Sequence, residues 1–231
     1  MLEKFRSGVN PSDFDEIADI LMRHAYIVVD NKNVTYRIRE IEFYLYCDTH
    51  KDLYAHGSPE QHLFEGVYLH RFGNGTFRGG TFKGMDLTLG NSNQRLGILV
   101  RGLISSDDQH IDGPCLAVNR ILTHYGVADV ESYVKRCVAD AGCNREEAVQ
   151  RFVSTGFLEN GREIQLIKGE RIGLSNKYPA YRHLPYRYGI KGLRYKKKFP
   201  VQEPAPTQVK LLVLTPNPTN NVHSTDESID L

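Results

Sequence analysis

The chain has 231 residues, 40% of them hydrophobic, which suits one medium-sized domain with a core of its own. It contains no run of about 18 apolar residues and no apolar segment at its N-terminus, so we expect neither a membrane span nor a secretory signal. Four cysteines without CxxC spacing predict reduced thiols in the nucleus or cytoplasm, and a net charge of +1 argues against a strong sequence-blind nucleic-acid binder.

The first predicted elements are a helix and a β-hairpin. Residues 12–24 form an apolar stripe at helical spacing, with Ser12 as the expected cap. Residues 25–30 predict a strand and residues 31–33 a turn. The second hairpin strand is then expected at residues 36–46, where aromatic and β-branched side chains alternate with charges.

The two faces of this second strand differ in character. The apolar face is formed by Ile41, Phe43 and Leu45. The opposite face carries two carboxylates and two phenol rings, from Glu40, Glu42, Tyr44 and Tyr46. Residues two apart on a strand lie roughly 6.5–7 Å apart, so the carboxylates can influence each other. This face is either a solvent-exposed edge or one wall of a pocket.

Further polar side chains follow on the next predicted elements. A loop at 48–62 holds three histidines, among them His56. Strands are expected at 66–71, 85–89 and 97–104, and they carry Tyr68, His70, Asp86 and Arg101. The glycines of 73–84 are too irregular for a phosphate loop, and they favour a tight turn or a close backbone approach.

The second half of the chain predicts helices and then a basic segment. Helices are expected from Pro114, at 130–137 and at 145–155, and short strands at 163–168 and 171–174. Residues 171–202 contain nine lysines or arginines and no acidic residue, with tyrosines interleaved. Such a segment is either a solvated basic face or a surface for a polyanion. Residues 201–231 predict a largely disordered tail, apart from a candidate edge strand at 209–214.

Several strands with helices inserted late predict an α+β fold. A carboxylate beside aromatic rings suits hydrolysis of a glycosidic bond, because it can stabilise a cationic sugar and accept a proton from water. An alkylated, positively charged base would gain about 0.5–2 kcal/mol from cation–π contact with such rings. A base in duplex DNA must first be flipped out of the stack.

The order of several short segments resembles the alkyladenine (3-methyladenine) DNA glycosylase family. Residues 37–45, Arg-Ile-Arg-Glu-Ile-Glu-Phe-Tyr-Leu, resemble the family's Arg-Ile-Val-Glu-Thr-Glu-Ala-Tyr-Leu, and the following loop ends Ala55-His56 as the family loop ends Ala-His. Residues 66–70 resemble its Gly-x-x-Tyr-x-Tyr strand, and 98–103 its Val-Leu-Leu-Arg-Ala-Leu strand. Residues 171–174 and 185–192 resemble its closing Arg-Val-Gly-Val and Pro-Leu-Arg-Phe-Tyr-Val-Arg-Gly segments.

The resemblance implies one glycosylase-like domain at residues 1–200, with a curved antiparallel sheet like the formyltransferase C-terminal-domain barrel and peripheral helices. It implies a DNA-3-methyladenine glycosylase-like hydrolase of base excision repair. No lysine is suitably placed in the strand at 36–46 for a lyase step, so we expect a monofunctional enzyme, and we expect no cofactor or metal. Glu42 would activate water, and Arg101 would support it. The base pocket would contain Tyr44, His56, Tyr68 and His70. Asp86 matches no residue of the family, and from the sequence it is either a second polar pocket group or a turn-stabilising carboxylate. Glu40 remains an alternative working acid.

DNA and the alkylated purine base are the expected partners of a monomer. The family inserts a bulky side chain, usually tyrosine, into the duplex, and here Phe82 or Lys83 would have to serve. DNA contacts are further expected from Arg182, Arg187, Lys191 and Arg194. The alternatives are a catalytically inactive nucleic-acid-binding relative and a hydrolase of a free nucleoside on the same fold.

Overall fold

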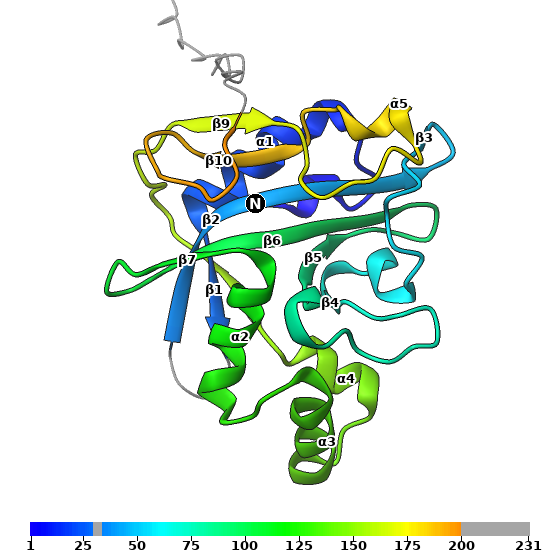
Figure 1. Ribbon diagram of the computed structural model, residues 1–231, viewed down its shortest axis with the longest axis vertical. Coiled ribbons are helices and arrows are strands. Elements are labelled where there is room, and N and C mark those ends of the chain that lie inside the picture. Colours follow the sequence, from blue (N-terminus) through cyan, green and yellow to red (C-terminus); the bar gives the residue numbers. More distant parts are fainter. Residues whose placement is uncertain (30–33, 200–231) are drawn as a thin grey trace, which may run out of the picture.

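The long strand β2 (Val34–Cys47) runs through the centre of the sheet and pairs with neighbours on both edges (Figure 1). The computed structural model describes residues 1–29 and 34–199. The turn predicted at 31–33, the tail at 201–231 and the strand at 209–214 lie outside the described residues. The predicted hairpin is confirmed, because β1 (Ala25–Val29) pairs antiparallel with the start of β2.

The described residues form one sheet of ten strands, with the order β4-β5-β6-β2-β1-β8 along its main path. β10 pairs with β2 and β9, β3 with β2, and β7 with β6, and every pairing is antiparallel. The other strands are β3 (His50–Lys51), β4 (Phe64–Leu69), β5 (Met85–Leu89), β6 (Arg95–Ser105), β7 (His110–Asp112), β8 (Ser154–Phe157), β9 (Leu166–Gly169) and β10 (Arg187–Ile190). The sheet is open among the described residues, since β4 and β8 end its path, and the fold is α+β.

Few helices accompany this sheet. They are α1 (Phe14–Asp19), α2 (Pro114–Tyr125), α3 (Val130–Ala141), α4 (Arg145–Gln150) and α5 (Pro179–Arg182). Helical turns precede and follow α1, so the predicted helix at 12–24 is confirmed, although its capping box joins Asn10 and Asp13 in place of Ser12. None of the helices in the described part of the chain is long and apolar enough to span a membrane.

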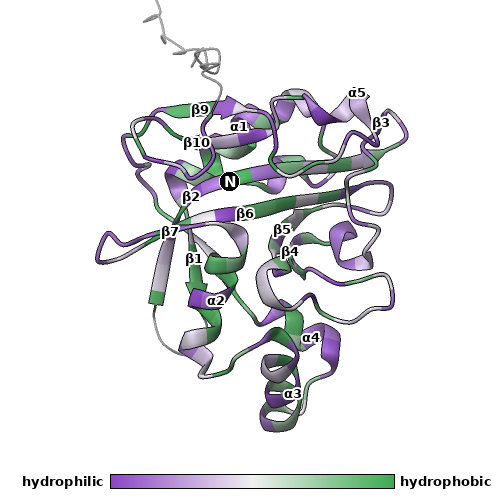
Figure 2. Ribbon diagram, viewed as in Figure 1, coloured by the Kyte–Doolittle hydropathy of each residue, from purple (hydrophilic) through white to green (hydrophobic). Residues whose placement is uncertain are grey.

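The core lies between the sheet and the helices that cover it. Phe14 of α1 stacks on Phe43 of β2 with ring centroids 4.3 Å apart, and α2 packs against β6. Figure 2 shows apolar residues along β1 and β6 and hydrophilic residues in the peripheral loops. The apolar face predicted for β2 is confirmed, because Ile41, Phe43 and Leu45 are fully buried.

Two predictions about the second half of the chain are wrong. The helix expected at 145–155 ends at Gln150, and residues 154–157 form β8 instead, because they pair with β1. The strand expected at 171–174 is a loop that begins at the buried Arg171. In both segments the conformation depends on contacts with residues far away in the chain, namely β1 for residues 154–157 and Asp52 for Arg171. Local sequence patterns do not indicate such contacts.

Candidate functional site

One row of paired residues crosses the sheet and brings the predicted site together. Glu42 of β2 pairs with Leu99 of β6, Leu99 with Asp86 of β5, and Asp86 with Tyr68 of β4. Directly paired residues of antiparallel strands project from the same face. Glu42, Asp86 and Tyr68 therefore share one face, and two strand spacings of about 4.8 Å each separate Glu42 from Asp86.

Glu42 is fully buried and held by three groups. Its Oε1 accepts a hydrogen bond from the backbone N–H of Ile172 at 2.8 Å and lies 3.4 Å from Nη1 of Arg101. Its Oε2 accepts a hydrogen bond from the hydroxyl of Tyr44 at 2.8 Å. The two side chains that touch it, Tyr44 and Arg101, are partly exposed, so they separate the carboxylate from solvent.

The surroundings of Glu42 shift its proton affinity. Burial raises the pKa of Glu42 above its ordinary value, and the nearby Glu40 adds to this, against the opposing effects of Arg101, Ile172 and Tyr44. Burial and the Glu42 carboxylate raise the pKa of Tyr44 well above its ordinary value. Tyr44 therefore keeps its proton at neutral pH, and Glu42 has the raised pKa that suits a general base.

Because the folded-state pKa of Glu42 is raised, ionisation of Glu42 opposes folding. The contribution of Glu42 to stability is fully present below its ordinary pKa of 4.5 and is lost as pH rises through the raised pKa of the folded state. We expect Glu42→Gln to unfold at a higher urea concentration than wild type at pH 8, with the difference shrinking toward pH 4. Equal midpoints at every pH would contradict the raised pKa.

Arg171 fixes the loop that reaches Glu42. Its buried guanidinium donates to the carboxylate of Asp52 at 2.5 Å and to the carbonyl of Phe43 at 3.0 Å, and it lies 4.6 Å from the ring centroid of Tyr44. These contacts place the N–H of the next residue, Ile172, on Glu42. The sequence analysis counted Arg171 among the cations of the basic segment 171–202. No local sequence pattern predicts its buried contacts with Asp52 and Phe43.

Glu40 belongs to a buried network with two arginines, one of which, Arg101, also contacts Glu42. Its Oε1 accepts from Nε of Arg101 at 2.9 Å and from Nε of Arg187 at 2.6 Å. The sheet pairing is irregular around Glu40, and Arg101 contacts both carboxylates of β2. Arg187 is 1% exposed, so the expectation that it contacts DNA is corrected: its guanidinium is held inside the domain.

The predicted aromatic wall is assembled from three chain segments. His56 comes from the loop after β3, Tyr68 from β4, and His70 from the residue after β4 ends at Leu69. The rings of His56 and His70 lie 4.5 Å apart edge to face, and Tyr68 lies 5.4 Å from each. Burial, together with the nearby His70, lowers the pKa of His56 to about 4, so His56 is uncharged at neutral pH.

Asp86 lies within β5 and contacts His70 and Gln61. It is 2% exposed, its Oδ1 lies 2.7 Å from Nε2 of His70, and its Oδ2 accepts from Nε2 of Gln61 at 3.1 Å. Two glycines leave room for this pair. A Cβ at Gly84 would lie 2.5 Å from His70 Nδ1, and one at Gly97 would lie 2.4 Å from Asp86 Oδ2.

The glycine-rich segment ends beside this wall. Phe82 is 68% exposed on a 3-10 turn (Gly80–Phe82), two residues before Gly84, whose carbonyl accepts from the N–H of His70 at 3.0 Å. Lys83 is half-buried. Of the two residues predicted to enter a duplex, Phe82 is thus the one with a large apolar side chain presented to solvent.

The remaining basic residues lie on the surface. Arg182 is partly exposed, and the exposed members are Lys177, Lys191, Arg194, Lys196, Lys197 and Lys198. We call these seven residues the basic surface. Ile172, whose N–H contacts Glu42, belongs to the same segment of the chain, residues 171–198, as these basic residues.

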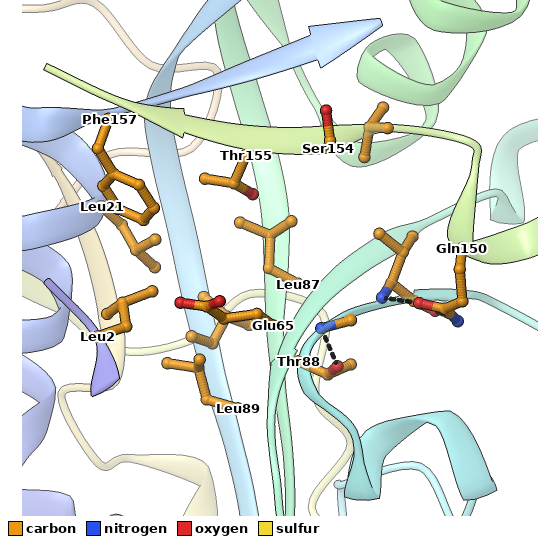
Figure 3. Close-up of a pocket in the computed structure, with 14 residues that line it drawn as sticks. Leu2, Leu21, Glu65, Leu87, Thr88, Leu89, Gln150, Ser154, Thr155 and Phe157 are labelled. Atoms are coloured by element: carbon orange, nitrogen blue, oxygen red, sulfur yellow. Dashed lines mark hydrogen bonds between the residues drawn. The ribbon is translucent and has the colours of Figure 1, made fainter. Parts of the chain in front are cut away.

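A cavity of about 260 Å³ lies elsewhere, between the N-terminal segment, β4 to β6 and β8 (Figure 3). Its wall is mostly apolar, and Leu87 and Ile98 pair in the row that alternates with Asp86 and Leu99, so they belong to the core-facing side of the sheet. The carboxylate of Glu65 points into this cavity (Figure 3). The cavity is therefore distinct from the site around Glu42.

Comparisons with known proteins give one informative match. No protein-family model matches the chain. The chain is 34% identical over 212 residues to "Uncharacterized protein L759" of Acanthamoeba polyphaga mimivirus, and the match covers 86% of this chain and 95% of the viral protein. Similarity of this extent along nearly the whole length of both proteins shows common descent. The chain therefore belongs to the same family as the mimivirus protein L759.

Proposed function

We propose that the protein is a monofunctional DNA N-glycosylase that releases alkylated purines. The observation that carries the proposal is the buried Glu42, held by Tyr44, Arg101 and Ile172 in the same sheet row as Asp86 and Tyr68. A carboxylate with a raised pKa can take a proton from water as the glycosidic bond breaks, and its charge stabilises the cationic sugar.

The aromatic wall supports an alkylated purine as the substrate. His56 and His70 are partly exposed and pack with the buried Tyr68 on the Glu42 face of the sheet, and a positively charged base would be attracted to such rings. Asp86 adds a negative charge beside the wall. Because an alkylated base with a positive charge is already a good leaving group, the reaction needs no second acid.

The basic surface supports DNA as the substrate carrier. Its seven cationic side chains can neutralise phosphates, which supplies sequence-independent affinity that falls with salt. Ile172, which donates to the Glu42 carboxylate, lies in the same segment of the chain as these cations. Phe82, on its exposed turn beside His70, would fill the gap left by a flipped nucleotide.

Replacing Phe82 with alanine tests this role. Flipping costs a few kcal/mol, so loss of the inserted ring is expected to slow base release from duplex DNA at least about tenfold. Release from single-stranded DNA should change little, since no stacked partner must be replaced. Phe72→Ala is the matched control, because Phe72 is an exposed phenylalanine of the same glycine-rich region. If Phe82→Ala and Phe72→Ala slowed base release equally, or if Phe82→Ala slowed release equally from duplex and single-stranded DNA, Phe82 would not be the inserted residue.

The direct test incubates the full-length protein with duplex DNA treated with a methylating agent. Chromatography should show free 3-methyladenine or 7-methylguanine, and the strand should break only after alkali, because no lyase step is expected. Strand breakage without alkali would contradict a monofunctional mechanism. Tight, salt-dependent binding without base release would replace the proposal with the second candidate below.

The proposal also includes the finer fold. We infer that the sheet corresponds to the formyltransferase C-terminal-domain barrel that the alkyladenine glycosylase resemblance implies. The irregular pairing of β2 around Glu40 supports this inference, since bulges bend strands and increase twist. An experimental structure in which the sheet superimposes on that barrel would establish it, and a flat sheet would refute it.

A second candidate is a nucleic-acid-binding relative without catalysis. The observation that favours it is the complete burial of Glu42, whose two oxygens already accept hydrogen bonds from Ile172 and Tyr44. In that case Glu42 would be a structural carboxylate, while the basic surface would still bind DNA. Base release by the wild-type protein would exclude this candidate.

A further inference from the structure

Three side chains of metal-ligating type converge in the aromatic wall. His56, His70 and Asp86 place one imidazole nitrogen each and one carboxylate oxygen within 4.8 Å of one another. Within residues 1–29 and 34–199 this is the one group of three such side chains whose ligand atoms converge. His56 and His70 are 14 positions apart in the chain, and His70 and Asp86 are 16 apart. Such wide spacing matches no short metal-binding motif.

We propose that His56, His70 and Asp86 bind one divalent transition-metal ion of the zinc class. Two imidazoles and one carboxylate are ligands that zinc, nickel, cobalt and iron accept, whereas magnesium and calcium prefer oxygen ligands alone. Three protein ligands leave at least one coordination position for water or an added ligand. The site is a proposal about binding and does not rest on the proposed glycosylase activity.

The distances suit a single ion after a small adjustment. Ligand atoms about 2.0–2.2 Å from a metal lie roughly 3 Å apart when they are neighbours in its coordination shell. His70 Nε2 and Asp86 Oδ1 are already 2.7 Å apart. The widest separation in the group, 4.8 Å at most, closes through rotation of the half-buried imidazole of His56 on its loop.

The groups behind the ligands hold them in place. Oδ2 of Asp86 accepts from Gln61, so its other oxygen faces His70, as expected for a metal-bound carboxylate with a fixed outer partner. Gly84 and Gly97 allow close packing against His70 and Asp86, and a side chain at either position would displace them. The pair is therefore fixed, and only His56 must move.

An ion here would occupy the wall that the proposed function assigns to a purine. The rings of His56 and His70 would point their nitrogens at the ion in place of offering their faces to a base. On the proposed function, the ion and the base would exclude each other. Metal binding itself is measured without DNA, so the two proposals can fail separately.

The test titrates the full-length, chelator-treated protein with Zn²⁺ in competition with a chromophoric chelator. Wild type is expected to bind one ion per chain, and His56→Ala and His70→Ala are each expected to bind at least about tenfold more weakly. His183→Ala is the matched control, because His183 makes an exposed pair with Glu170 at 3.1 Å and should leave the affinity unchanged. Circular dichroism in chelator checks the fold of each variant, and His56→Ala decides the outcome should His70→Ala not fold.

Cobalt identifies the ligands. Co²⁺ bound to nitrogen and oxygen should show visible d–d bands without intense near-ultraviolet thiolate bands, and the visible bands should disappear in His56→Ala. Thiolate bands would assign the metal to the cysteines and overturn the proposal. Absence of stoichiometric binding, or equal affinity in wild type and both histidine variants, would overturn it as well.

Discussion

Glu42→Gln is expected to lower base release from alkylated DNA by about 10²–10⁴-fold, because the amide cannot accept the proton of the attacking water. Glutamine retains the size of the side chain and an oxygen that accepts from Ile172, so the site should keep its shape. Single-turnover release of 3-methyladenine measures the effect, and binding to the same duplex should remain within a few-fold of wild type.

The pH dependence provides a second readout of the same residue. Since burial raises the pKa of Glu42, release by wild type should rise with pH through a midpoint above 4.5, the ordinary value for a glutamate. The residual activity of Glu42→Gln should lack this transition. Glu65→Gln is the matched control, since Glu65 lies on the other cavity and should retain full activity with the same profile. Full activity in Glu42→Gln would refute the mechanism.

Glu40→Gln is expected to lower the free energy of unfolding by about 3–5 kcal/mol, the usual cost of removing one partner from a buried ion pair. Glu40 is 1% exposed and accepts from both Arg187 and Arg101, so the variant leaves the buried Arg187 without its carboxylate. A domain is typically stable by 5–15 kcal/mol, so this loss is large. Urea denaturation should show a lower midpoint with an unchanged slope.

The control for Glu40 is an exposed pair. Glu16 forms an ion pair with Lys4 at the surface, and Glu16→Gln should change stability by less than about 1 kcal/mol. The experiment also decides between the two carboxylates of β2. If Glu40→Gln kept wild-type stability and lost activity, Glu40 would be the working acid and our assignment to Glu42 would be wrong.

Local patterns were sufficient for the elements that place the site. Alternation along β2 predicted that Ile41, Phe43 and Leu45 face the core, because side chains on a strand point to opposite sides at a period of two. The same pattern predicted that Glu42 and Tyr44 share a face, and the hydrogen bond between them agrees with it. The alternating pattern also identified the polar residues of β4, β5 and β6 as candidates for the site.

The sequence did not indicate which charged side chains are buried. Arg171 and Arg187 read as members of a basic surface, yet both are buried, because Asp52 and Glu40 lie 119 and 147 positions away and supply their partners. A run of cations has the same local composition whether its members meet solvent or a distant carboxylate. Strand pairing and loop packing determine whether each cation is exposed to solvent or paired with a buried carboxylate.

Local periodicity and residue type were enough to predict the α+β class, the polar face of β2 and the candidate residues of the site. The tertiary structure decided that Glu42 has its own hydrogen-bond partners, that Glu40 belongs to a buried arginine network, and that His56 meets His70 and Asp86. The physical reason is that strand register and loop packing set these contacts. Both depend on residues far apart in the chain, and no local pattern records them.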